Sequence, residues 1–206
     1  GCNFKCPFCH NRDLVFLDEN ENEIPLDDIF SFLNERKNIL DGVCISGGEP
    51  LLQKGLKDFI IQVKKLGLSI KVDTNGSQYE KLKELIDEGL IDYVAMDIKN
   101  SKDKYAMTID VNGFDLSAVE KSVELLKESK VDYEFRTTIV KEFHTLDDMQ
   151  KIGEWLKGAK RYFLQSYVDS ENVIKKGLHA HDKATLEQFR ELLTNYIEHV
   201  ELRGIE

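Results

Sequence analysis

Three of the four cysteines in this 206-residue chain lie within its first nine residues. Cys2, Cys6 and Cys9 are spaced C-x3-C-x2-C in the string GCNFKCPFCHN, whereas Cys44 lies far along the chain. Three thiolates on one short loop are a suitable ligand set for an iron–sulfur cluster. Because such clusters commonly take four cysteines, three local ones predict a cubane with one iron open to another ligand.

Three other interpretations of these cysteines remain open at this point. Disulfides are typical of small secreted proteins, and they suit neither this length nor this clustering. A Cys3His zinc site would have to use His10, but the side chains of adjacent residues such as Cys9 and His10 diverge, and zinc loops use a more distant second ligand pair. The third alternative is cysteines without a shared role.

The composition limits the class of protein. Net charge is −10, which argues against broad binding to nucleic acid or to anionic membranes. Hydrophobic residues make up 41% of the chain, as in ordinary globular proteins, and no apolar run is long enough to cross a bilayer. Clustered, reduced cysteines favour the cytoplasm. We therefore expect one cytoplasmic domain, residues 1–206, with no nucleic-acid or membrane partner.

Strand and helix patterns alternate along the chain. Strands are predicted at residues 43–46, 69–74, 92–99, 133–140 and 162–166, with a short terminal strand at 200–203. Apolar residues recur at helical spacing in segments 25–33, 56–63, 82–86, 119–126, 149–156 and 186–197. An acidic turn at 18–23 should lie in solvent. Such alternation predicts a parallel sheet covered by helices.

The order of elements predicts a partial barrel. A cysteine loop of this kind should follow a strand, and the chain opens at Gly1 without one. We therefore expect a longer natural N-terminus, with the first strand missing or truncated here. Counting that strand gives six βα units, and eight would close a full barrel. The predicted fold is thus an α/β, TIM-like partial (β/α)6 barrel with an open side.

Polar residues gather where the predicted strands end, which is where sites form in parallel α/β folds. The strand at 43–46 is followed by Gly47-Gly48-Glu49-Pro50, whose glycines would let a backbone approach a ligand. The strand at 92–99 ends in Asp97-Ile98-Lys99. Since residues two apart share a strand face, Asp97 and Lys99 should point together into the barrel mouth. Lys99 would then be placed to pair with a ligand carboxylate.

Two carboxylates should meet at neighbouring strand tips. Asp73 opens the string Asp73-Thr74-Asn75-Gly76 and should lie close to Asp97. Desolvated carboxylates repel unless a cation or proton intervenes. This predicts a monovalent cation between Asp73 and Asp97, with Thr74 and the carbonyl of Ala95 as further ligands. The alternative is that both are solvated loop carboxylates.

The strand at 133–140 carries Glu134, Arg136 and Thr138 on one face. An arginine inside a barrel needs an anion, either a ligand or an internal partner such as Glu134 or Asp97. Gln165 lies on the next strand. His144 follows the arginine strand and is a candidate for the mouth. Cys44, within an apolar strand, is predicted to be a small core residue.

The string GCNFKCPFCHNRDLV, with Phe8 before the last cysteine, resembles the radical SAM superfamily and, within it, the activating enzymes of glycyl radical enzymes. The DTNG and DxK elements also resemble pyruvate formate-lyase activators. The strings YEFRTTIV, GAKRYFLQSY and VELRG resemble activators of anaerobic ribonucleoside-triphosphate reductase.

The resemblance implies two cofactors, a [4Fe–4S] cluster on the three N-terminal cysteines and S-adenosylmethionine (SAM). It implies that Ser46, Gly47, Gly48 and Glu49, which overlap the GGEP element at residues 47–50, clamp the SAM amino group and that Asp97 accepts from this ammonium. It also implies that Arg136 binds the SAM carboxylate, Phe8 contacts adenine and Gln165 lies near adenine or ribose. Asp73 and Asn75 complete the expected SAM site.

The implied reaction is reductive cleavage of SAM, followed by hydrogen abstraction from a glycine Cα of a partner enzyme, expected to be anaerobic ribonucleotide reductase. A flavodoxin or ferredoxin would supply the electron, and the polar segment 100–115 would contact the partner. A pyruvate formate-lyase type partner, a small-molecule substrate and a non-enzymatic iron–sulfur redox sensor are the alternatives. The lack of a second cysteine cluster and of a large C-terminal domain favours a protein substrate.

Overall fold

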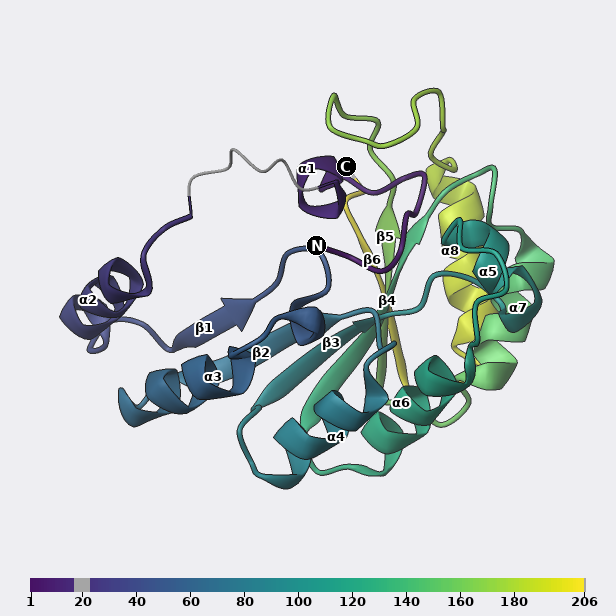
Figure 1. Cartoon of the computed structure of the whole chain (residues 1–206). Coiled ribbons are helices and arrows are strands. Elements are labelled where there is room, and N and C mark those ends of the chain that lie inside the picture. The colour runs from purple at the N-terminus through teal and green to yellow at the C-terminus, as the bar shows by residue number, and fades with distance from the viewer. Residues whose placement is uncertain (17–22, 206) are drawn as a thin grey trace.

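The computed structural model describes residues 1–16 and 23–205, which contain one six-stranded parallel sheet (Figure 1). Its strands are β1 Gly42–Ile45, β2 Ser69–Thr74, β3 Tyr93–Asp97, β4 Asp132–Ile139, β5 Arg161–Ser166 and β6 His199–Arg203. Each strand pairs in parallel with the next one in the chain. A sheet with this order needs a crossover of the same hand at every step, and this brings the crossover helices to one face.

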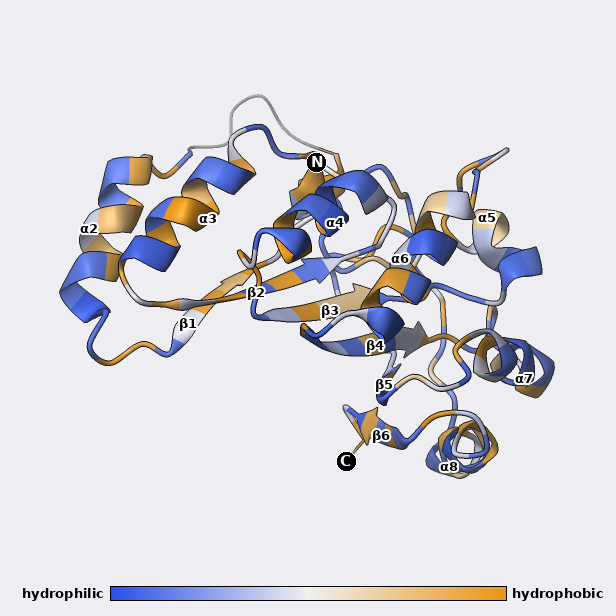
Figure 2. Ribbon diagram, turned by 90° about the horizontal axis from the view of Figure 1, so that it is seen from below, coloured by the Kyte–Doolittle hydropathy of each residue, from blue (hydrophilic) through white to orange (hydrophobic). Residues whose placement is uncertain are grey.

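Helices cover the outer face of the curved sheet, as Figure 2 shows from below. The helices of the described residues are α1 Arg12–Val15, α2 Leu26–Arg36, α3 Leu56–Lys65, α4 Tyr79–Asp87, α5 Tyr105–Thr108, α6 Ser117–Glu128, α7 Leu146–Trp155 and α8 Lys183–Leu193, with 3-10 turns η1 Pro50–Leu52 and η2 Lys102–Lys104. The predicted strands and helices are confirmed, with ends that shift by a few residues. The short elements α1, α5, η1 and η2 were not predicted.

The alternation of β2 separates the two faces of the sheet. Ile70 and Val72 are fully buried under the helices, whereas Lys71 and Asp73 are half-buried on the opposite, concave face. Burying an aliphatic side chain contributes about 1.5–3 kcal/mol, so the apolar face fixes the strand register. The charged side chains are thereby directed to the concave face.

The β1 edge is less buried than predicted. Cys44, expected in the core, is exposed, because β1 is an edge strand and Cys44 pairs in register with Lys71 of the concave face. Leu26 was expected on the buried face of its helix and is 58% exposed, whereas Leu33 is buried. A short apolar strand alone does not show whether it lies inside a sheet or at its edge.

The predicted α/β partial barrel is confirmed by the six-stranded parallel sheet. The further strand before the cysteine loop and the single-domain assignment stay predictions. Most of the predicted acidic turn, residues 18–22, lies outside the described residues. Within residues 1–16 and 23–205, no helix has the length and apolarity needed to cross a membrane.

Candidate active site

The three N-terminal cysteines line one cleft at the C-terminal edge of the sheet, with a volume of about 200 Å³. The described chain brings predicted site residues from five segments into the same cleft. They are Cys2, Cys6, Phe8, Cys9, Ser46, Gly47, Gly48, Asp73, Thr74, Asn75, Asp97, Lys99 and Arg136. Glu49 and Gln165 are not among its lining residues.

Two loops hold the cysteine loop by its backbone. After β3, the carbonyl of Ile109 accepts from the Lys5 N–H at 2.9 Å. After β5, Ile174 N–H donates to the Cys9 carbonyl at 3.2 Å and Lys175 N–H donates to the Pro7 carbonyl at 2.8 Å. Segment 100–115, predicted to contact a partner, therefore also supports the cysteine loop from one side.

Aromatic packing anchors the start of the same loop. Phe4 is 2% exposed and meets Tyr105 and Phe114 edge-on, with ring centroids 6.4 and 5.1 Å away. Further along, Phe8 is buried against Phe143 and His144. The cysteines thus sit on a loop whose apolar residues point into the core while the thiols face the cleft.

The donor set fits an iron–sulfur cluster. Burial raises the pKa of the Cys6 thiol to about 12, against the opposing effect of Lys99. A thiol of this kind ionises when iron binds, since the thiolate is the metal ligand. Among the described residues, no three His, Cys, Asp or Glu side chains lie close enough together to bind one metal ion. A cubane does not need such convergence, because each thiolate binds a different iron.

The glycines of the GGEP element have separate roles. Gly47 adopts φ +141°, a conformation that disfavours side chains, at the cleft wall. A Cβ on Gly48 would lie 2.2 Å from the Gly1 carbonyl oxygen, and the neighbouring Glu49 N–H donates to that same oxygen at 2.9 Å. The absence of a side chain at Gly48 therefore leaves room for the Gly1 carbonyl to approach this backbone.

Glu49 was predicted to clamp a ligand, and the structure places its carboxylate elsewhere. The side chain is buried and accepts from Leu51 N–H at 3.1 Å, from the Thr74 hydroxyl at 2.8 Å and from Asn75 N–H at 2.7 Å. All of these donors belong to the protein, so the carboxylate joins η1 to the end of β2. The carboxylate of Glu49 is thus engaged by the protein, and a ligand contact through its backbone stays a prediction.

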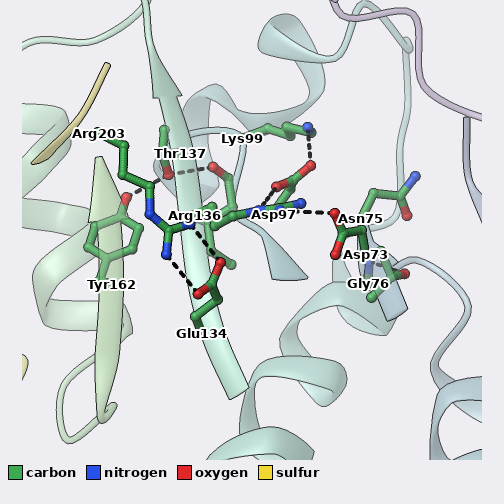
Figure 3. Close-up of polar contacts among 12 residues, drawn as sticks. Asp73, Asn75, Gly76, Asp97, Lys99, Glu134, Arg136, Thr137, Tyr162 and Arg203 are labelled. Carbon is green, nitrogen blue, oxygen red and sulfur yellow. Dashed lines mark hydrogen bonds and ion pairs between the residues drawn. The ribbon is translucent and has the colours of Figure 1, made fainter. Parts of the chain in front are cut away.

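Five charged residues form a continuous chain of ion pairs across the tips of β2, β3 and β4, here called the strand-tip chain (Figure 3 shows its central part). Lys71 Nζ lies 2.8 Å from Asp73, and Asp73 lies 3.0 Å from Arg136 Nη1. Arg136 Nε donates to Asp97 at 2.9 Å, and Lys99 Nζ donates to the other Asp97 oxygen at 2.9 Å. The three cations and two carboxylates leave one positive charge in excess.

The strand-tip chain corrects the predicted cation site. Arg136 lies between Asp73 and Asp97 and supplies the positive charge that was assigned to a monovalent ion. Thr74, a proposed ligand, donates its hydroxyl to Glu49 instead. Burial opposes ionisation of Asp97, but Lys99 and Arg136 outweigh it and hold its pKa below the usual value.

A second ion pair lies lower on the concave face and is here called the lower pair. Arg203 of β6 donates through both Nη atoms to Glu134 of β4, at 2.9 and 3.0 Å. Tyr93 donates its hydroxyl to the same carboxylate at 2.9 Å. The Arg203 guanidinium lies 3.3 Å above the Phe163 ring. Glu134, considered as a partner for Arg136, is therefore paired with Arg203 (Figure 3).

Two further predicted residues lie away from the cleft. Gln165 is half-buried on β5, in register with Thr138 and one strand further from the cysteines than Arg136. His144, a candidate for the mouth, is fully buried. Its Nδ1 accepts from Val140 N–H at 3.0 Å, so Nε2 carries the proton and donates to the Lys99 carbonyl at 2.9 Å. Burial lowers the pKa of His144 to about 4.

Residues that the sequence reasoning did not single out also shape the site. Lys71 holds Asp73, and its position two residues earlier on the same strand was a usable signal. Asn3 bonds Asn75 and Ser77, and nothing in its sequence context indicates these partners. Asn11 and Val15 line the cleft from the loop and the short helix α1.

Comparison with known proteins places this arrangement in a family. Residues 1–156 match the model of the radical SAM superfamily. A Methanocaldococcus jannaschii protein named "Putative glycyl-radical enzyme activating enzyme" is 34% identical over 100% of this chain and 86% of its own length.

Solved structures show the same fold at 18% identity. Streptococcus suis SuiB bound to S-adenosylmethionine superposes with a TM-score of 0.76 over 100% of this chain and 48% of that one. A domain of a pyruvate-formate lyase-activating enzyme from Bacteroides vulgatus superposes with a TM-score of 0.64, covering 79% of this chain and 99% of that one. With the family model matched over residues 1–156 and the cysteines facing one cleft, this chain belongs to the radical SAM superfamily.

Proposed function

We propose that this protein activates a glycyl radical enzyme and that its partner is anaerobic ribonucleoside-triphosphate reductase. Similarity along the whole chain to a protein named as a glycyl-radical enzyme activating enzyme supports the reaction class. The strings YEFRTTIV, GAKRYFLQSY and VELRG support the choice of reductase. The observation that carries the proposal is that three cysteines share a cleft with the cations Lys99 and Arg136.

Radical SAM enzymes use a [4Fe–4S] cluster and S-adenosylmethionine, and this chain belongs to them. Cys2, Cys6 and Cys9 would hold three irons of the cluster, in a cleft that Gly47 and Lys99 also line. When bound, the cluster supplies the single electron that splits the sulfonium of SAM, so that the resulting carbon radical can take a hydrogen atom.

The strand-tip chain would bind the methionyl end of SAM. Its three cations face only two carboxylates, so a ligand carboxylate would balance the remaining charge. Lys99 and Arg136 are our candidates for that carboxylate, with Asp97 accepting from the ligand ammonium. Phe8 would border the adenine, while Ser46, Gly47 and Asn75 shape the wall beside the methionyl group.

The concave face gives the partner a route to the cleft. Below the cleft, the side chains of Lys71, Arg161 and Arg203 keep 35%, 41% and 39% of their surface exposed. A backbone loop carrying a glycine would enter along this polar face and place its Cα at the cleft. Closure of the loop over the cleft would exclude water and hold the reacting atoms in contact.

Three further assignments complete the proposal. The electron would come from a flavodoxin or a ferredoxin, and the reaction would take place in the cytoplasm, where thiols stay reduced. Residues 1–206 would act as one domain, since a single sheet runs from β1 to β6.

The proposal is tested with anaerobically reconstituted protein. Adding dithionite and SAM should yield 5′-deoxyadenosine, and adding the anaerobic reductase should yield a glycyl radical signal in electron paramagnetic resonance. Cys6→Ser should abolish both the cluster and the product. Cys44→Ser is the matched control, because Cys44 is exposed and is not among the cleft's lining residues, and it should keep both.

Each failure points to a different alternative. An intact cluster that forms no 5′-deoxyadenosine would favour a redox sensor. Product without a radical on the reductase, but with one on pyruvate formate-lyase, would replace the partner. Product with no glycyl radical on either enzyme would favour a small-molecule substrate.

A further inference from the structure

Asn3, Asn75 and Ser77 form a closed ring of hydrogen bonds beside the first cysteine. Ser77 N–H donates to Asn75 Oδ1 at 3.0 Å, and Asn75 Nδ2 donates to Asn3 Oδ1 at 3.0 Å. Asn3 Nδ2 then donates to the Ser77 hydroxyl at 2.8 Å. The ring joins the cysteine loop to the turn that follows β2, at residues 75 to 77.

The ring fixes which way the Asn75 amide points. A backbone N–H can only donate, so the atom facing Ser77 N–H must be the Asn75 oxygen. The amide nitrogen is therefore directed at the cysteine loop, where it also lies 3.9 Å from Cys2 Sγ. Asn75 is 5% exposed, and its own backbone N–H is held by Glu49 at 2.7 Å. Neither the residue nor its amide is free to turn.

The three cysteine sulfurs are consequently unequal. Cys2 Sγ accepts from two N–H donors, the Phe4 backbone at 3.4 Å and Asn75 Nδ2 at 3.9 Å. Within residues 1–16 and 23–205, no N–H group of the protein donates to the sulfur of Cys6 or Cys9. The hydrogen bonding to sulfur is thus concentrated on one ligand.

We propose that Asn75 is a positioning residue that donates an N–H···S hydrogen bond to Cys2 and thereby raises the reduction potential of the cluster. The inference rests on the proposed function, because it requires that Cys2 bind a cluster. Hydrogen bonds to ligand sulfurs stabilise the more negative, reduced state, and they are among the factors that set iron–sulfur potentials. Reduction of the cluster is the step that Asn75 would favour.

The test compares midpoint potentials of reconstituted proteins, measured by a redox titration followed by electron paramagnetic resonance, without SAM. Asn75→Ala removes the donor. Asn75→Asp keeps the shape and the bond from Ser77 N–H but replaces the amide nitrogen with an oxygen. Both variants should have a lower midpoint potential than the wild type. At a fixed solution potential, Asn75→Ala should show about a tenfold smaller ratio of reduced to oxidised cluster, which corresponds to a shift of 59 mV in the midpoint potential for one electron.

Ser77→Ala is the matched control. It removes the hydroxyl that accepts from Asn3. The hydrogen bond from the backbone N–H of residue 77 to Asn75 Oδ1 is retained, so the Asn75 amide keeps its direction. It should loosen the ring without moving the potential.

The outcomes separate this inference from the function on which it rests. Lower potentials in both Asn75 variants, with full iron content and an unshifted Ser77→Ala, support it. Unchanged potentials in cluster-loaded Asn75 variants overturn it alone. An equal shift in Ser77→Ala also overturns it, since loop packing would then be the cause. A wild-type chain that binds no cubane overturns the proposed function itself.

Discussion

Two groups of ion pairs lie on the same concave face, and their charge balance differs. In the lower pair, Arg203 and Glu134 match one cation with one carboxylate through two parallel hydrogen bonds. Tyr93 donates to the same carboxylate, and the Phe163 ring lies against the guanidinium. The strand-tip chain instead strings three cations along two carboxylates, with Lys99 at its end beside the cysteines.

The difference in charge balance indicates that the lower pair is structural, whereas the strand-tip chain is suited to binding a ligand. A bidentate pair that matches one cation with one carboxylate has little charge to offer a ligand, and it joins β4 to β6 across β5. The strand-tip chain has one cation more than it has carboxylates, and Lys99 and Arg136 line the cleft, so these two cations can take an added anion. Position on the same face is therefore a weaker guide to function than charge balance within each group.

The largest effect is expected for Arg136→Met. The substitution leaves Asp73 and Asp97 close together without the cation between them, and removing one partner of a buried pair costs about 3 kcal/mol. It also removes a ligand contact, so SAM should bind about 100-fold more weakly, which is roughly 2.7 kcal/mol. Chemical denaturation and calorimetric titration measure the two losses. An unchanged SAM affinity would place the ligand carboxylate elsewhere.

Arg203→Met should give the same loss of stability without the loss of binding. It leaves the buried Glu134 carboxylate with Tyr93 alone, which should cost about 3 kcal/mol in the free energy of unfolding. SAM affinity should stay within about twofold, a change below 0.5 kcal/mol. Adding Glu134→Gln removes the unpaired charge and should restore part of the stability. A binding loss as large as that of Arg136→Met would contradict the division into two groups.

Mild acid should destabilise the protein through His144. Burial lowers the pKa of His144 to about 4, against about 6.5 in the unfolded chain, so the unfolded state binds more protons between these values. Stability is then full well above pH 6.5 and falls as the pH drops toward 4, by about 2.5 kcal/mol at pH 4.5. Burial opposes ionisation of Asp97 and Glu134, but Lys99 and Arg203 respectively outweigh it and lower the pKa values of these carboxyl groups.

Denaturation curves at pH 7.5 and 4.5 measure this loss. His144→Gln, which cannot gain a proton, should be less stable at pH 7.5 and should show a flatter dependence on pH. A wild-type slope in this variant would assign the acid sensitivity to another group.

The sequence predicted best what depends on local spacing. C-x3-C-x2-C on one loop brings three thiols together whatever the rest of the chain does, and the two-residue period of a strand placed Asp97 and Lys99 on one face. The alternation of strands and helices likewise predicted the parallel sheet.

What the sequence did not predict was the choice among partners. Arg136 had Glu134, Asp97 and a ligand as plausible anions, and the choice depends on how far β4 is offset against β3 and β6. Glu49 follows two glycines at a strand tip, yet its carboxylate turns inward to three protein donors. Cys44 looked like a core residue because edge and interior strands share the same composition.

The smallest effect compares the two ends of the strand-tip chain. Lys99→Met removes the cation nearest the cysteines, while Asp97 keeps Arg136, so stability should change little. SAM should nevertheless bind about tenfold more weakly, or roughly 1.4 kcal/mol.

Lys71→Met removes a cation from the other end, where Asp73 also keeps Arg136. Because Lys71 is not among the lining residues of the cleft, its loss should weaken SAM binding by about twofold at most, or 0.4 kcal/mol. Equal losses at the two ends, measured by calorimetric titration, would mean that the ligand responds to the total charge of the chain and not to contact with Lys99.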